Sequence, residues 1–196
     1  GQYSASEVEQ KLANTLYLLN HIDSLDLLHT RAIPFIPKWI SVPYFTYMEG
    51  QFQNGDVLNF FYQPQITKQV QRDGEAFIIH GKASFNQRQV NLADLLFEEP
   101  PIYRAAALLH EFRHSEGHRH VENTAKDARI TDGGCYAVEA EFLARVAYLA
   151  SSTDVDSLTR VQAKEKLQEL TSLAWIEYQP QDSLEAWERF LKKVRI

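Results

Sequence analysis

Apolar and polar residues follow a helical period at both ends of the chain. Apolar residues recur every three or four positions from Val8 to Leu19. Ser4 stands three residues before Glu7, in the capping-box pattern, so we expect a helix over about residues 5–20. The same period predicts three helices in the C-terminal half, over Cys135–Ala150, Val155–Trp175 and Ser183–Val194.

The middle of the chain has the composition of β-strands. Val42–Tyr47 is aromatic and β-branched, and the Asn54-Gly55 turn leads to Asp56–Tyr62. We therefore expect these two segments to pair as a hairpin. A second turn at Asp73-Gly74 precedes a third predicted strand, Glu75–His80.

Composition is that of a folded protein with a full core. The chain has 196 residues, of which 44% are hydrophobic and 12% aromatic. We expect a single α+β domain over residues 1–196, with a small antiparallel or mixed sheet packed against a central helix and a helical C-terminal half.

A helical run over residues 102–112 leads into His110-Glu111-x-x-His114. Residues i and i+4 share one helix face, so the two imidazoles could bind one zinc ion from a single rigid element. Glu111 lies about 100° further round the helix. From there it could accept a proton from a zinc-bound water without ligating the metal. The alternative is a helix whose histidines only lie at its surface.

Two residues are candidates for the third zinc ligand. His120 follows His114 at a spacing that would let the chain turn back after Gly117. Glu139 falls in the middle of the apolar arc of the predicted Cys135–Ala150 helix, where an unpaired carboxylate would cost several kcal/mol. A cation is therefore expected beside Glu139, either zinc or, in the alternative, an arginine such as Arg104 or Arg113.

The motif helix followed by Glu139 on a second helix resembles the gluzincin group of zinc peptidases. Val138-Glu139-Ala140-Glu141 is similar to the Glu-Ala-Asp segment of one gluzincin branch. This resemblance implies that Glu139 binds zinc and that Glu141 supports a histidine. The longer run from His110 to His120 is also similar to the metzincin signature, although metzincins carry a methionine turn downstream and the one methionine here, Met48, lies upstream.

These resemblances imply a zincin-like fold and a zinc-dependent hydrolase, expected to be a metallopeptidase that binds one Zn²⁺ per chain. Glu111 is then the general base, and Tyr136 and His118 are candidate donors to the oxyanion. The strand Glu75–His80 is the candidate edge for an extended peptide. The alternative is a catalytically inactive zincin-like domain that binds metal or a protein partner.

Charge and cysteine content narrow the choice of partners. The net charge is −6 without a basic patch, so we expect a peptide or protein substrate and no nucleic acid. Apolar runs such as Ala105–Leu109 are too short for a membrane span. We therefore expect a soluble protein. The single cysteine, Cys135, excludes an internal disulfide. The start at Gly1 without Met leaves two compartments open, because the protein is either cytoplasmic or exported with its signal peptide removed.

Overall fold

The computed structural model describes residues 2–25, 39–40, 42–50, 59–86, 89–118 and 133–170, and the single positions 185, 189 and 192. Within these ranges the helices are α1 (Ala5–Asp23), α3 (Tyr44–Gly50), α4 (Asp94–Phe97), α5 (Pro101–His114), α6 (Cys135–Tyr148) and α7 (Ser157–Glu169). The strands are β1 (Asn59–Tyr62), β2 (Ile66–Arg72), β3 (Glu75–Gly81), β4 (Ala83–Asn86) and β5 (Gln89–Leu92). The predicted α+β class is confirmed.

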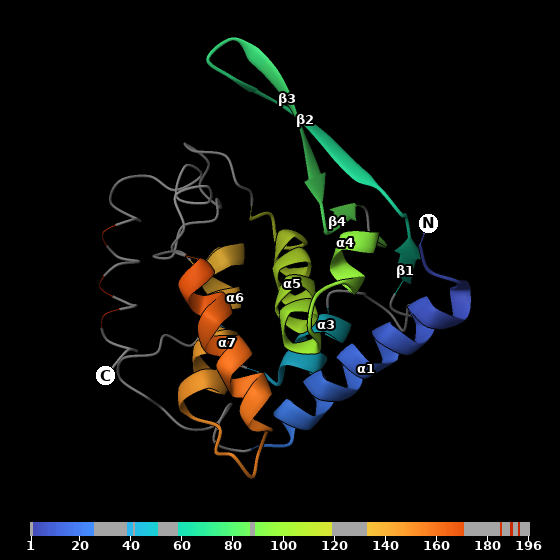
Figure 1. Ribbon diagram of the computed structural model, residues 1–196. Coiled ribbons are helices and arrows are strands. Elements are labelled where there is room, and N and C mark those ends of the chain that lie inside the picture. Colours follow the sequence, from blue (N-terminus) through green and yellow to red (C-terminus); the bar gives the residue numbers. More distant parts are fainter. Residues whose placement is uncertain are drawn as a thin grey trace.

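Helix α5 lies at the centre of the described structure (Figure 1), where it packs against α1, α6 and α7 and against strand β4. Pro101 occupies its first position, where a missing N–H costs nothing. Leu108, Leu109 and Phe112 are fully buried. The helix that carries the histidine motif is therefore held on several sides, which fixes where its side chains point.

Helix α6 is the second buried helix. All its residues except Tyr136 and Tyr148 are buried. It packs directly on α5, as predicted. Asp156 caps the N-terminus of helix α7, because its carboxylate accepts a hydrogen bond from the Thr159 N–H at 2.7 Å. The predicted helix over Ser183–Val194 falls mostly outside the described residues.

The described strands form two separate sheets. In the first, of order β1-β5-β4, β5 pairs in parallel with β1 and antiparallel with β4. In the second, β2 and β3 form a hairpin that projects away from the helices (Figure 1). Asp73 and Gly74 both have positive φ angles, of 51° and 80°, so the turn predicted there is confirmed. The strand predicted over Glu75–His80 is confirmed as β3.

The hairpin predicted between Val42–Tyr47 and Asp56–Tyr62 is wrong. Tyr44–Gly50 is helical, and Asn59–Tyr62 pairs in parallel with β5 instead. The cause lies far away in the sequence: the Asp23 carboxylate accepts the N–H groups of Tyr44 and Phe45 at 2.7 and 2.6 Å. These are donors that a helix start leaves unsatisfied. The Asn54-Gly55 turn lies outside the described residues.

Glu141 joins α6 to this early segment. Its side chain is 1% exposed and lies one helical turn from Arg145, whose Nε is 3.4 Å from Glu141 Oε1. The carboxylate also accepts the Trp39 N–H at 2.8 Å and the Tyr44 hydroxyl at 3.1 Å. The carboxylate of Glu141 can be buried because these partners satisfy its charge.

We expect Tyr44→Phe to destabilise the protein by about 1.5–3 kcal/mol, because it removes a hydrogen bond to a buried carboxylate. Chemical denaturation measures this loss. The matched control is Tyr17→Phe, whose side chain is 76% exposed and which should change the free energy of unfolding by less than about 0.5 kcal/mol. Equal effects of the two substitutions would mean that the hydrogen bond from Tyr44 to Glu141 does not stabilise the fold.

None of the helices in the described ranges combines the length and the apolar character needed to cross a membrane.

Candidate metal centre

The two motif histidines lie side by side on α5, as their spacing predicts. The ring centroids of His110 and His114 are 5.0 Å apart. Nδ1 of His114 lies 2.6 Å from the carbonyl oxygen of His118. A ring N–H that donates to a backbone carbonyl leaves the opposite nitrogen, Nε2, available to a metal. Burial, followed by the charge of His110, lowers the pKa of His114 to about 4, so its ring is in the neutral form that metals require.

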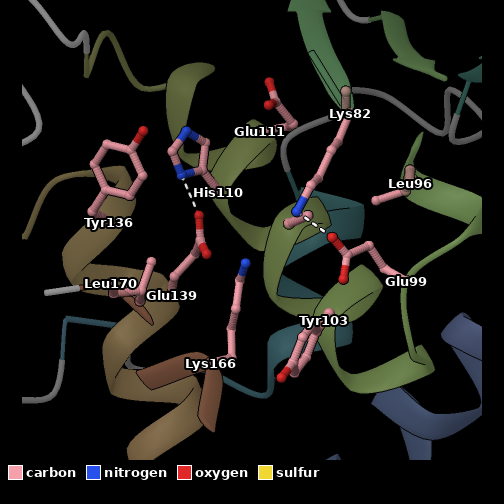
Figure 2. Close-up of a pocket in the computed structure, with 12 residues that line it drawn as sticks. Lys82, Leu96, Glu99, Tyr103, His110, Glu111, Tyr136, Glu139, Lys166 and Leu170 are labelled. Atoms are coloured by element: carbon pink, nitrogen blue, oxygen red, sulfur yellow. Dashed lines mark ion pairs between the residues drawn. The ribbon is translucent and has the colours of Figure 1, made fainter. Parts of the chain in front are cut away.

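Glu139 of α6 faces the first histidine (Figure 2). Its Oε1 lies 2.5 Å from Nδ1 of His110, and both side chains are 9% exposed. Burial lowers the pKa of His110, but the charge of Glu139 and the contact with it raise the pKa above its ordinary value. The suggested arginine partners point elsewhere: Arg104 donates to α1 and to the Glu99 carbonyl, and Arg113 donates to the Gly133 carbonyl. Among the described contacts, the group that faces Glu139 is therefore His110 and neither of the two arginines.

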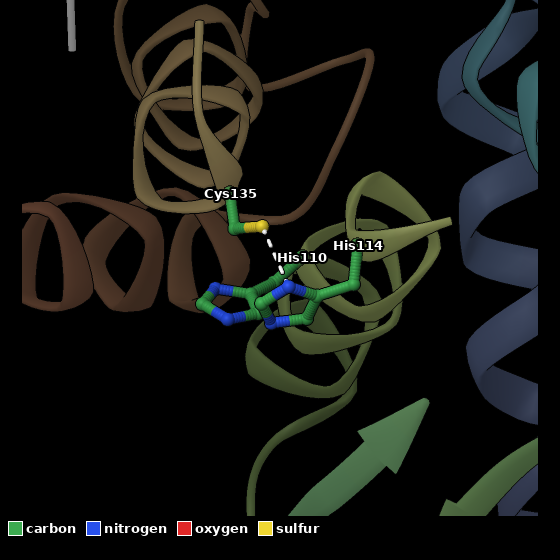
Figure 3. Close-up of side chains that lie close together, drawn as sticks. All are labelled: His110, His114 and Cys135. Atoms are coloured by element: carbon green, nitrogen blue, oxygen red, sulfur yellow. Dashed lines mark hydrogen bonds between the residues drawn. The ribbon is translucent and has the colours of Figure 1, made fainter. Parts of the chain in front are cut away.

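Cys135 offers a third candidate ligand atom, which the sequence analysis did not include among the zinc ligands. It is the first residue of α6, and its Sγ lies 3.3 Å from Nδ1 of His114 (Figure 3). One ligand atom each from His110, His114 and Cys135 lie within 4.8 Å of one another. Burial raises the pKa of the thiol. The sequence could have pointed to Cys135 through helical spacing, because Cys135 stands one turn before Glu139 and therefore on the same face of α6.

Glu111 has the electrostatics of a group that exchanges protons near neutral pH. Burial, assisted by the charge of Glu139, raises its pKa to about 7. The charge of His110 and a backbone hydrogen bond from Phe85 act in the opposite direction. Phe85 belongs to β4, the strand that packs against α5, whereas β3 pairs with β2 in the projecting hairpin. Strand β4, and not the predicted Glu75–His80 strand, therefore borders the motif helix.

Four other residues were predicted to belong to the site: Tyr136, His118, His120 and Glu141. The Tyr136 ring contacts the His110 ring edge to face, with centroids 4.6 Å apart. His118 is buried, and its carbonyl positions His114. His120 lies outside the described residues. The described contacts of Glu141 are with Trp39, Tyr44 and Arg145, so the supporting contact to a histidine that the gluzincin resemblance implied for it is made by Glu139 instead.

A cavity of about 230 Å³ opens beside these groups. The residues that line it come from α5, α6, α7, α4 and the start of β4, and several are drawn in Figure 2. Those nearest the motif are His110, Glu111, Tyr136 and Glu139. Two candidate metal ligands, His110 and Glu139, and the candidate base Glu111 thus line one cavity that a small ligand could enter.

Comparisons with protein-family models, with curated proteins and with solved structures found no match for this chain.

Proposed function

We propose that the protein is a zinc-dependent hydrolase with a zincin-like arrangement of its site, and that it acts on peptide bonds. The observation that carries this proposal is geometric: Glu111 lines the same cavity as His110 and Glu139. Burial also raises the pKa of its carboxyl group to about 7. A general base works best when its pKa lies near the working pH. A metal site with only a structural role has no need of such a neighbour.

The donor set fits zinc, which binds imidazole, thiolate and carboxylate. His110 and His114 would hold the ion, with Glu139 as the preferred third ligand and Cys135 and His120 as the competing choices. Zinc would supply Lewis acidity, which acidifies water and polarises a carbonyl group.

The protein's own groups would then divide the remaining work. Glu111 would accept a proton from the attacking water and return it to the leaving amine. Tyr136, which contacts His110 at the cavity wall, is placed to donate a hydrogen bond to the developing oxyanion. The carboxylate of Glu139 would keep the His110 ring in one orientation until metal binds.

A peptide library offered to the zinc-loaded protein tests this function directly. We expect cleavage products by mass spectrometry that disappear when zinc is chelated and return when it is restored. A protein that binds zinc but cleaves no peptide would instead support the second candidate, a non-catalytic zincin-like domain, which the buried His110–Glu139–Cys135 surroundings also allow.

Glu139→Gln should weaken zinc binding more than His120→Asn does. The glutamate contacts His110 at 2.5 Å, and even residues that only orient a metal-binding histidine typically contribute about 10–100-fold in affinity. Competition with a chromophoric chelator gives the two zinc affinities, and Cys135→Ser measured beside them ranks the thiol. If His120→Asn or Cys135→Ser causes the larger loss, the third ligand is that residue and not Glu139.

A further inference from the structure

The cavity extends well beyond the metal-binding groups. It follows one face of α5 from Tyr103, past Ala107, to His110 and Glu111. Glu111 lies eight positions after Tyr103, which corresponds to about 12 Å of helix axis. An extended peptide residue spans about 3.3–3.6 Å, so the far end of the cavity lies three or four peptide residues from Glu111.

Lys166 of α7 brings a positive charge into this far end. Its side chain is only 15% exposed, and its Nζ lies 2.8 Å from Glu169 and 5.1 Å from the centre of the Tyr103 ring. Burial lowers the pKa of Lys166, but the hydrogen bond to Glu169 and the charges of Glu139 and Glu99 raise it above the ordinary value. The ammonium group is therefore charged although it is largely removed from water.

Lys82 brings a second ammonium group from the opposite wall (Figure 2), just before β4. It forms an ion pair with Glu99. An ammonium group has three N–H donors, so a lysine paired with one carboxylate can still donate to another acceptor. Figure 2 shows the ammonium groups of Lys82 and Lys166 both directed into the cavity.

The charge of this part of the wall favours an anion. At the end of the cavity away from His110, Glu111 and Glu139, the charged residues that line it are Lys82, Lys166 and Glu99. Glu169, which pairs with Lys166, is 63% exposed and does not line the cavity. The wall therefore carries a net charge of about +1, and bound zinc would make the cavity more positive.

We propose that the cavity binds a carboxylate of the substrate between Lys82 and Lys166, within about four residues of the bond that is cleaved. The substrate assignment rests on the proposed hydrolase function, whereas the carboxylate site itself does not. The volume of about 230 Å³ is below the usual range for small-molecule pockets, roughly 300–1,000 Å³, and suits a short peptide end. The carboxylate could be a free C-terminus or the side chain of Asp or Glu.

Three peptides distinguish these sources: N-acetyl-Ala-Ala with a free C-terminus, its C-terminal amide, and N-acetyl-Asp-Ala amide. Calorimetry measures their affinities for the full chain, with zinc and after chelation. We expect at least one of the two carboxylate peptides to bind about tenfold or more tightly than the uncharged amide, because hydrogen bonds between charged groups contribute on that scale. The free acid identifies a C-terminal site, and the Asp peptide a side-chain site.

Substitution of the lysines assigns the contact. Lys82→Met and Lys166→Met keep the length of the stem and should each reduce the carboxylate preference about tenfold. Lys164→Met is the matched control, since Lys164 lies on the same helix but over the Tyr148 ring and should have no effect. Thermal unfolding verifies that the variants fold. If Lys166→Met does not fold, Lys82→Met still tests the site, because the side chain of Lys82 is 40% exposed and its substitution should leave the fold intact.

The proposal is overturned if none of the peptides binds at millimolar concentration, if acid and amide bind equally, or if the preference survives in both lysine variants. If the preference for carboxylate peptides disappears on chelation but is unchanged in both lysine variants, the carboxylate binds only the metal. If the lysine-dependent preference is observed and no peptide is cleaved, the carboxylate site stands and the hydrolase function falls.

Discussion

Glu111→Gln should abolish hydrolysis while leaving the fold and zinc binding intact. The substitution preserves the size of the side chain but removes the group that accepts the proton, and a general base contributes about 10²–10⁴-fold to the rate. The effect should be near the upper end, because the burial that raises the pKa of Glu111 to about 7 makes it a stronger base than an exposed carboxylate. The rate of peptide cleavage, measured at equal zinc content, gives the ratio.

Glu98→Gln is the control for this substitution. Glu98 is an exposed glutamate that follows α4 and does not line the cavity, so its change should leave the rate unaltered. If Glu111→Gln cleaves the same peptides as fast as the unmodified protein, then Glu111 is not the base, and the metal would have to act with another group.

His110→Ala and His114→Ala should each lower zinc affinity by more than about 100-fold. That bound follows because residues that only support a metal-binding histidine already contribute about 10–100-fold. His110→Ala also removes the contact to Glu139 and should in addition destabilise the metal-free protein. Elemental analysis after dialysis against a weak chelator measures the retained zinc.

His80→Ala is the matched histidine control. His80 is exposed on the projecting hairpin and is a poor candidate for a ligand, so its substitution should leave zinc content unchanged. Equal zinc content in the His110, His114 and His80 variants would mean that any bound metal lies elsewhere.

The core of the candidate site could be predicted from the sequence because it depends on helical periodicity. The i, i+4 spacing placed His110 and His114 on one face, and the wheel of the second helix turned Glu139 toward the first. Both predictions use local geometry, which a sequence encodes directly.

Other features depended on contacts between distant residues and could not be predicted. Aromatic composition favoured a strand at Tyr44, but the Asp23 carboxylate at the end of α1 caps a helix there. The gluzincin resemblance implied that Glu141 supports a histidine, but its carboxylate instead accepts the Trp39 N–H, which comes from another part of the chain. The sequence analysis used Cys135 only to exclude a disulfide, because its position within 4.8 Å of candidate ligand atoms of His110 and His114 depends on how two helices pack.

Diffraction data collected at the zinc absorption edge from a crystal of the zinc-loaded protein test the central claim most directly. We expect one anomalous peak between the rings of His110 and His114, at about 2.0–2.1 Å from one nitrogen of each, in the range typical of zinc–imidazole bonds. The side chain that completes the coordination then identifies the third ligand. A crystal that takes up no zinc, or that holds it away from both histidines, would contradict the account.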